Sequence, residues 1–251
     1  MPADAPLTGK TAIVTGSGRG IGAAIARQLA ADGAQVVINY VSDADAAGAV
    51  HDAVTQAGGS AIVVQADAGS EEGTARLAEA AIEAFGGIDI LVSNAGPLFR
   101  PIPLTEMTWQ DFGGLLEADA RCAFHSTKAV LPTMIEQGHG RIVYIGSASS
   151  GHASPGLAHH GSARAAVTTF ARYVAAETGR HGITANVVAP GMVRTDRTAA
   201  AGPMLERIGA MTPVGRVATP EDVARAVAFF AGDDAGFYTG TVFPVDGGLS
   251  A

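Results

Sequence analysis

The chain is poor in cysteine, aromatic residues and basic residues, and these shortages exclude several classes of protein. Its one cysteine, Cys122, cannot form an internal disulfide, which fits a reducing compartment. Lysine and arginine number 16 against 24 acidic residues, and the net charge of −8 argues against a nucleic-acid partner. No apolar run approaches the roughly 18 residues that span a bilayer, and residues 1–10 lack the pattern of a signal peptide. We therefore expect a cytoplasmic protein with no membrane partner.

Glycine is abundant, with 33 residues, and short runs rich in valine and isoleucine recur along the chain. These runs predict strands at residues 11–15, 35–39, 61–65, 88–93, 141–146, 183–189 and 241–245. Amphipathic stretches between them predict helices at residues 20–32, 43–57, 71–86, 109–137, 157–180 and 219–232. The strands are too continuously apolar to have a face in water, as is typical of parallel strands covered by helices on both sides. The alternation predicts an α/β fold: a single Rossmann-type domain over residues 1–251, with a doubly wound parallel sheet of about seven strands.

Residues 190–218 interrupt this alternation with a long segment rich in glycine and proline. A long irregular segment inside a compact domain is usually functional, so we expect a substrate lid. Methionine, leucine and isoleucine occur in this segment, and Pro97–Phe99 is also apolar. These side chains favour an apolar or aromatic small-molecule substrate.

Residues 11–22 read TAIVTGSGRGIG, a strand that leads through a glycine-rich turn into a helix. Gly16, Gly20 and Gly22 have the spacing G-x-x-x-G-x-G. Glycine lets the backbone turn sharply and approach a pyrophosphate, whose charge then meets the positive end of the helix. The turn therefore predicts a nucleotide site.

Three further segments follow expected strands: Asp67, Asn94–Gly96 and Pro190–Gly191. Ligands of an open α/β sheet bind at the carboxyl ends of its strands, where all of these segments fall. Together with the glycine turn they indicate a dinucleotide.

The end of the second expected strand bears on which dinucleotide binds. An acid at this place typically accepts hydrogen bonds from the ribose of NAD, but residues 39–42 read Asn-Tyr-Val-Ser. Arg19, inside the glycine turn, can meet a 2′-phosphate. Asp43 and Asp45 would repel that phosphate, unless they simply cap the next helix. We therefore expect NADP(H) in preference to NAD(H).

These motifs, together with residues 141–164, resemble the short-chain dehydrogenase/reductase family over residues 8–249. The likeness extends to NADP(H)-dependent 3-oxoacyl-carrier-protein reductases and to ketoreductases of aromatic polyketides. It implies a homodimer or homotetramer that pairs through the helices at 109–137 and 157–180. It also implies that the cofactor contacts Gly16, Ser17, Arg19, Gly20, Ile21, Gly22, Asn39, Tyr40, Ser42, Asp67, Ala68, Asn94, Ala95, Gly96, Arg164, Pro190, Gly191, Val193 and Thr195.

The catalytic segment of that family is altered in this chain. Members have a serine, a tyrosine thirteen residues later and a lysine four residues further on; here Ser147 is followed by His160 and Arg164. The family's asparagine, one helix earlier, matches Asp119. By resemblance, the tyrosine donates a proton to the substrate carbonyl, the lysine lowers its pKa and holds the ribose, and the serine binds the carbonyl. Three of these four residues are replaced.

The replacements remain compatible with acid–base chemistry. We expect the pKa of His160 to lie within about 1.5 units of the ordinary histidine value, so that the ring exchanges protons near neutrality. Arg164 keeps the positive charge but cannot pass a proton on. Asp119 can pair with Arg164 or orient His160.

Three functions remain open from the sequence. The first is an NADP(H)-dependent carbonyl reductase with His160 as proton donor. The second is a non-redox dehydratase, isomerase or cyclase that uses His160 and Asp119, and the third is a non-catalytic, nucleotide-binding partner of an active paralogue. A hydrolase triad is disfavoured because residues 146–150 lack the second glycine of a nucleophile elbow. His152 and His159 are interpreted as loop residues and no metal site is expected.

Overall fold

Seven short strands form one parallel sheet in the computed structural model, which describes residues 5–250. Residues 1–4, part of the segment judged for a signal peptide, lie outside this range. The strand order is β3-β2-β1-β4-β5-β6-β7, and every neighbouring pair is parallel. The strands are β1 (Thr11–Val14), β2 (Gln35–Tyr40), β3 (Ser60–Gln65), β4 (Ile90–Ser93), β5 (Gly140–Ile145), β6 (Ile183–Pro190) and β7 (Val242–Val245).

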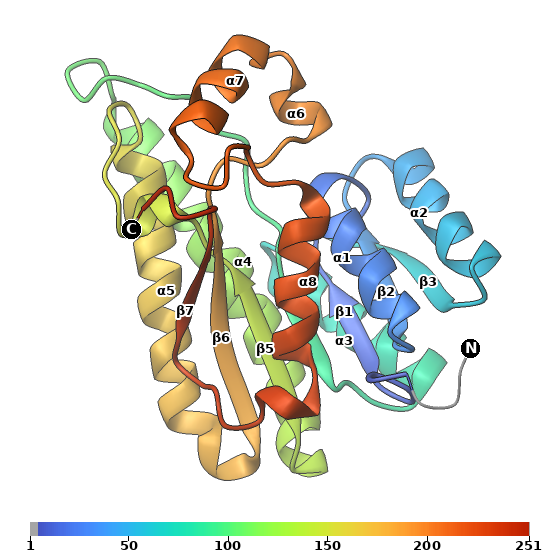
Figure 1. Cartoon of the computed structure of the whole chain (residues 1–251). Coiled ribbons are helices and arrows are strands. Elements are labelled where there is room, and N and C mark those ends of the chain that lie inside the picture. The colour runs from blue at the N-terminus through green and yellow to red at the C-terminus, as the bar shows by residue number, and fades with distance from the viewer. Residues whose placement is uncertain (1–4, 251) are drawn as a thin grey trace.

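Helices cover both faces of this sheet (Figure 1). The α-helices are α1 (Gly20–Ala31), α2 (Ala44–Gln56), α3 (Glu71–Phe85), α4 (Trp109–Gln137), α5 (Ala158–Thr178), α6 (Asp196–Ala199), α7 (Gly202–Met211) and α8 (Pro220–Ala231). Short 3₁₀ turns are η1 (Ala148–Ser150), η2 (Gly179–His181) and η3 (Asp233–Ala235). The predicted fold class is confirmed, and the expected strands and main helices agree with the structure to within two residues at each end.

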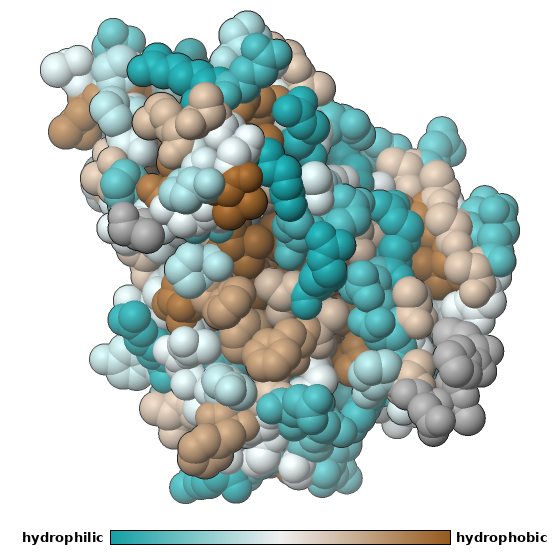
Figure 2. Space-filling view, viewed as in Figure 1, coloured by the Kyte–Doolittle hydropathy of each residue, from teal (hydrophilic) through white to brown (hydrophobic). Residues whose placement is uncertain are grey.

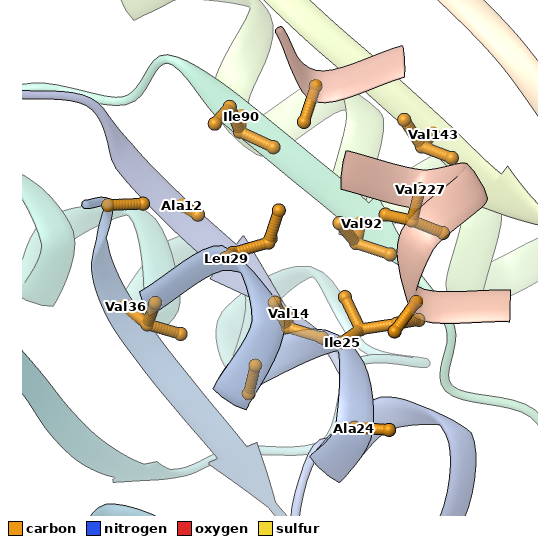
Figure 3. Close-up of a cluster of buried hydrophobic side chains, with 14 of the residues drawn as sticks. Ala12, Val14, Ala24, Ile25, Leu29, Val36, Ile90, Val92, Val143 and Val227 are labelled. Carbon is orange, nitrogen blue, oxygen red and sulfur yellow. The ribbon is translucent and has the colours of Figure 1, made fainter. Parts of the chain in front are cut away.

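Each face of the sheet has its own apolar core. On one face, Ile25 and Leu29 of α1 and Val227 of α8 pack over the strand residues Val14 and Val92 (Figure 3). On the other face, α3, α4 and α5 pack over the opposite side chains of the same strands. All five residues named here are almost fully buried. Burial on both faces explains why the inner strands are so rich in apolar residues. The outer strands β3 and β7 are partly exposed, which corrects the expectation that no strand has a face in water.

The segment 190–218 is not irregular throughout, which corrects the sequence-based expectation. It contains α6 and α7, which lie beyond the carboxyl ends of the strands (Figure 1). Gly202 and Pro203 stand at the start of α7, where proline costs no hydrogen bond because the first helical N–H groups have no helical partner. The glycines and prolines therefore mark a helix start and turns inside the segment.

Among residues 5–250, none of the helices is long and apolar enough to cross a membrane.

Candidate active site

The glycine turn after β1 adopts the conformation that its sequence requires. Gly16 and Gly20 have φ angles of 62° and 56°, in the left-handed region that favours glycine. A Cβ on Gly22 would lie 2.4 Å from the Gly16 carbonyl oxygen and 2.6 Å from Asn94 Nδ2. The turn is therefore packed too closely for a side chain at this position, as expected where the start of a helix packs against the turn that precedes it.

Asn94 and Thr15 tie this turn to the end of β4. Asn94 Nδ2 donates to the carbonyl oxygens of Thr15, at 2.9 Å, and Gly16, at 3.1 Å. Thr15 Oγ1 in turn accepts from the backbone N–H groups of Asn94 and Ala95, both at 3.0 Å. The sequence-based reasoning missed Thr15; its place directly before the first glycine of the turn was the available signal.

Asn39 and Ser17, both expected to contact the cofactor, support the glycine turn with their side chains. Both are fully buried. Asn39 Oδ1 accepts from the backbone N–H of Gly16 at 2.9 Å, and its Nδ2 donates to the carbonyl of Ala66 at 2.9 Å. Ser17 Oγ accepts from the backbone N–H of Asn39 at 2.8 Å and donates to Val14. Every polar atom of these two side chains is used within the fold.

Arg19 precedes the first residue of α1, and its side chain is 69% exposed. Its Nη1 lies 4.0 Å from Asp43 Oδ2, while Asp43 Oδ1 accepts from the N–H of Ala46 and caps α2. Ser42 beside it is exposed and Tyr40 is half-buried. Asp43 thus has both roles considered from the sequence, as a helix cap and as a negative charge near Arg19.

The other expected cofactor residues surround the same edge of the sheet. Asp67 is exposed and its Oδ1 accepts from the N–H of Gly69 at 2.8 Å, whereas Ala68 is buried beside it. The Thr195 methyl group lies 3.7 Å from where a Cβ of Gly20 would stand, so the start of α6 covers the glycine turn. The remaining expected residues are half-buried or buried at the strand ends: Ile21, Ala95, Gly96, Pro190, Gly191 and Val193.

Ser147 lies directly after β5 and caps η1. Its Oγ accepts from the N–H of Ser149 at 3.2 Å, and the side chain is half-buried. A Cβ on Gly161 of α5 would stand 2.8 Å from the Ser149 carbonyl oxygen. The start of α5 is therefore packed against η1, which brings the segment carrying His160 to Ser147.

Asp119 of α4 and Arg164 of α5 form a buried ion pair. Arg164 Nε lies 3.2 Å from Asp119 Oδ2, with side-chain exposures of 14% and 1%, although the pair lacks hydrogen-bond geometry. Arg164 Nη1 donates to the Ile145 carbonyl at 2.9 Å, and Nη2 packs against Gly96. Burial raises the pKa of the Asp119 carboxyl, and Arg164 opposes that rise. Of the two roles expected for Asp119, the structure shows the pairing with Arg164.

His160, near the start of α5, is buried beneath Phe99. The two rings are stacked, with centroids 3.8 Å apart and planes 15° apart. Its Nδ1 has no hydrogen-bond partner within residues 5–250. Burial, with Arg164 and then His159, lowers the pKa of His160 to about 4. The expectation of a pKa within about 1.5 units of the ordinary value is therefore wrong, because burial and a nearby cation both disfavour the imidazolium.

His159 is a helical residue, not a loop residue as expected. It is buried in α5, and its Nε2 lies 3.1 Å from the Arg100 carbonyl oxygen. In the part of the chain that the structure describes, no group of three or more histidine, cysteine or acidic side chains is arranged to hold a metal ion.

The arrangement places a glycine turn and a serine–histidine–arginine set at one sheet edge, and comparison with known proteins assigns it to a family. A family model described as enoyl-(acyl carrier protein) reductase matches residues 16–250. A 3-oxoacyl-[acyl-carrier-protein] reductase of Synechocystis sp. is 40% identical over 246 residues, which cover 97% of this chain and 98% of the relative. The chain belongs to the short-chain dehydrogenase/reductase family. Its relatives are named as oxidoreductases, which supports an oxidoreductase of the short-chain type.

Solved structures of the family have the same architecture. A short-chain dehydrogenase/reductase from Serratia marcescens BCRC 10948 superposes with a TM-score of 0.91 at 35% identity, covering 98% of this chain and 100% of that chain. A blue fluorescent protein from a metagenomic library, solved in complex with NADPH, has a TM-score of 0.90 at 37% identity, with coverages of 98% and 100%.

Proposed function

We propose that this protein is an NADP(H)-dependent ketone reductase in which His160 replaces the usual tyrosine. The observation that carries the proposal is the complete nucleotide turn: Gly16 and Gly20 are left-handed, Gly22 has no room for a side chain, and Asn94 is hydrogen-bonded to the turn. This backbone conformation and close packing favour glycine at these positions. A turn of this kind is typical of proteins that bind a nucleotide, so its presence supports a nucleotide-binding function.

The residues of the glycine turn fit an NADP(H) cofactor. The N–H groups at the start of α1 suit a pyrophosphate, and the exposed Arg19 and Ser42 suit a 2′-phosphate. The family member solved with NADPH supports this preference. When bound, the nicotinamide supplies the hydride that reduces the carbonyl.

The part left to the chain is to polarise the carbonyl and provide a proton. At neutral pH a His160 with a pKa of about 4 is an uncharged imidazole, which donates a hydrogen bond to a carbonyl oxygen without carrying a proton in excess. That hydrogen-bonded proton moves to the oxygen as the alcohol forms, which leaves an imidazolate near the positive charge of Arg164. A water at the edge of the ring, which the Phe99 face does not cover, then returns the proton. The Ser147 hydroxyl supplies a second hydrogen bond to the same oxygen. Arg164 stays protonated and balances Asp119.

An apolar or aromatic substrate suits the surface beside Phe99, the ring that is stacked on His160. A cavity of about 490 Å³ lies between the loop after β4 and the start of α4, lined by Pro97, Leu98, Phe99, Arg100, Ile102, Asp111, Gly114, Leu115 and His159. Most of these side chains are apolar, and Met204 and Met211 of α7, in the expected lid segment, are exposed as well. Such a lining favours a hydrophobic ketone over a sugar phosphate.

Assembly into a homodimer or homotetramer forms part of the proposal. An apolar groove of about 360 Å³ lies between α4 and α5, and Phe124 at its rim is 49% exposed. Figure 2 shows a second gathering of apolar side chains near α8 and β7, where Phe229 and Phe243 are exposed. Exposed apolar patches of this kind mark protein contacts. We place the protein in the cytoplasm, where the thiol of Cys122 would stay reduced.

A second candidate is a nucleotide-binding protein that does not transfer hydride. The observation in its favour is that Arg164 is engaged by Asp119 and by the Ile145 carbonyl. A guanidinium held in this way is less available to the cofactor ribose than the family's lysine.

Oxidation of NADPH by a panel of ketones tests the proposal. The panel should contain acetoacetyl thioester, aryl ketones and cyclic diketones, with nucleotide binding measured in parallel by fluorescence. We expect turnover with an apolar ketone, and His160→Phe should lower it by about 10²–10⁴-fold, the usual contribution of a general acid. His152→Phe, at an exposed histidine, is the matched control and should leave turnover unchanged. NADPH binding without oxidation by any ketone would favour the second candidate, and normal turnover in His160→Phe would exclude the proposed role of His160.

A further inference from the structure

The Phe99 ring contacts both of the neighbouring histidines at the start of α5. It is stacked on His160 and meets His159 edge to face, with centroids 6.0 Å apart and planes at 86°. Both histidines are buried, whereas Phe99 is 40% exposed. The phenyl ring therefore separates the face of the His160 imidazole from solvent.

The loop that carries Phe99 is fastened on its C-terminal side. The Arg100 carbonyl oxygen can only accept a hydrogen bond, so His159 Nε2 donates to it across 3.1 Å. The N–H of Ile102 donates to the Gly156 carbonyl at 2.9 Å, and Gly156 has a left-handed φ of 78°. A Cβ on Gly156 would lie 3.1 Å from Pro101 Cβ, so the two loops are in close contact. Two hydrogen bonds thus fix the backbone within three residues of Phe99.

We propose that Phe99 and His159 are positioning residues for His160. His159 fastens the loop through the Arg100 carbonyl, and the Phe99 ring then covers the imidazole, keeps it dry and holds its plane in one orientation. This proposal rests on the proposed function only for the catalytic role of His160. The stacking of Phe99 on His160 is present in the protein without substrate.

The surroundings of His160 determine what this cover does. The charged and titratable groups that act on the ring are Arg164 and His159, both on α5, and each disfavours the imidazolium. Phe99, on the facing loop, excludes water from the face of the imidazole and carries no charge. Removing its ring admits water to the imidazole while the two α5 groups stay in place, so the protonated form becomes easier to reach.

NMR titration of the histidine rings tests this cover in the protein without substrate. The chain has seven histidines, and the His160 signal is identified by its loss in His160→Phe. In the wild type we expect His160 to remain neutral as the pH falls, down to the limit of the folded state. In Phe99→Ala its proton affinity should rise by about tenfold or more, toward the ordinary histidine value. Phe99→Tyr, which keeps the ring, should behave as the wild type.

Two further variants distinguish the effect of the Phe99 ring from that of any change in the loop. Leu98→Ala alters an adjacent side chain that is 69% exposed, and it should leave the His160 titration unchanged. His159→Phe removes both the donor to Arg100 and a group that itself disfavours the imidazolium, so it should shift the titration in the same direction as Phe99→Ala, by less. An unchanged titration in Phe99→Ala, or an equal shift in Leu98→Ala, would overturn the proposal. Since the titration needs no turnover, it tests the cover even if the protein reduces no ketone.

Discussion

Two regions at the carboxyl ends of the strands differ in how completely their polar groups are hydrogen-bonded: the nucleotide edge, around the glycine turn at residues 15–22, and the catalytic edge, around His160 and Arg164. Around the glycine turn, the side chains of Thr15, Ser17, Asn39 and Asn94 all have partners within the fold. At the catalytic edge, buried polar atoms lack hydrogen-bond partners. Of the seven such atoms found in residues 5–250, five belong to Asp119, His159, His160 and Arg164.

This difference shows that the two regions are held together by separate sets of hydrogen bonds. The nucleotide edge is held by hydrogen bonds among its own residues, and none of them involves Asp119, His160 or Arg164. Changes at the catalytic edge therefore leave these hydrogen bonds intact, and the contact between the two regions is the packing of Arg164 Nη2 against Gly96. The catalytic edge instead holds the buried ion pair of Asp119 and Arg164 and the buried imidazole of His160.

The largest effect should come from breaking the buried pair. Asp119→Ala leaves the Arg164 guanidinium buried without a counter-charge, which should destabilise the fold by about 3–5 kcal/mol. Denaturation in urea at neutral pH measures this loss. Glu71→Ala, which breaks an exposed pair with Lys128, is the matched control and should change the stability little.

Substituting the residues that the family has at these positions tests whether Asp119, His160 and Arg164 depend on one another. We expect the triple variant Asp119→Asn, His160→Tyr and Arg164→Lys to differ in activity and stability from the sum of its single changes, because Asp119 and Arg164 are in contact. Additive effects would mean that the three replacements are independent of one another.

A smaller effect should follow from adding one methyl group at the nucleotide edge. In Gly22→Ala the new Cβ meets the Gly16 carbonyl and Asn94, so we expect a loss of about 1–3 kcal/mol in stability together with weaker NADPH binding. Gly48→Ala in α2, where a Cβ has no neighbour within 4 Å, should instead be neutral or gain up to about 1 kcal/mol. Thermal denaturation and fluorescence titration of both variants check this. Equal behaviour of the two would show that the turn is not closely packed.

The smallest effect concerns the choice between NADPH and NADH. Arg19→Ala should weaken NADPH binding about tenfold and leave NADH binding unchanged, because only NADPH carries the 2′-phosphate. Asp43→Asn keeps a capping side chain for α2 but removes the charge that faces Arg19, so it should strengthen NADPH binding by about threefold. Fluorescence titrations with NADPH and NADH measure these affinities. Equal affinities of the wild type for the two nucleotides would contradict the preference for NADP(H).

The fold could be predicted from the sequence because its signals are local. Short apolar runs such as residues 36–38 indicate strands by themselves, and the alternation with amphipathic stretches implies parallel pairing. The segment 190–218 was predicted less well. The glycines and prolines there indicated loops, whereas α7 forms because Pro203 is tolerated in its first turn.

The site could be predicted only in part, since spacing identifies positions but not contacts. Counting from Ser147 found His160 and Arg164, but the stacking of Phe99 on His160 joins segments that are far apart in sequence. The burial of Asn39 and the low pKa of His160 likewise depend on tertiary packing. Residue type alone suggested a polar ligand in the first case and a group titrating near neutrality in the second.

The most direct test of this account is the pH profile of NADPH-dependent ketone reduction, compared between the wild type and His160→Phe. A folded-state pKa of about 4 means that His160 is uncharged on both sides of the ordinary histidine pKa. We therefore predict that turnover at saturating NADPH changes by no more than about twofold between roughly pH 5.5 and 8, with most of it lost in His160→Phe. A profile with a midpoint near the ordinary histidine value that disappears in His160→Phe would contradict the account, because the working group would then be an imidazolium.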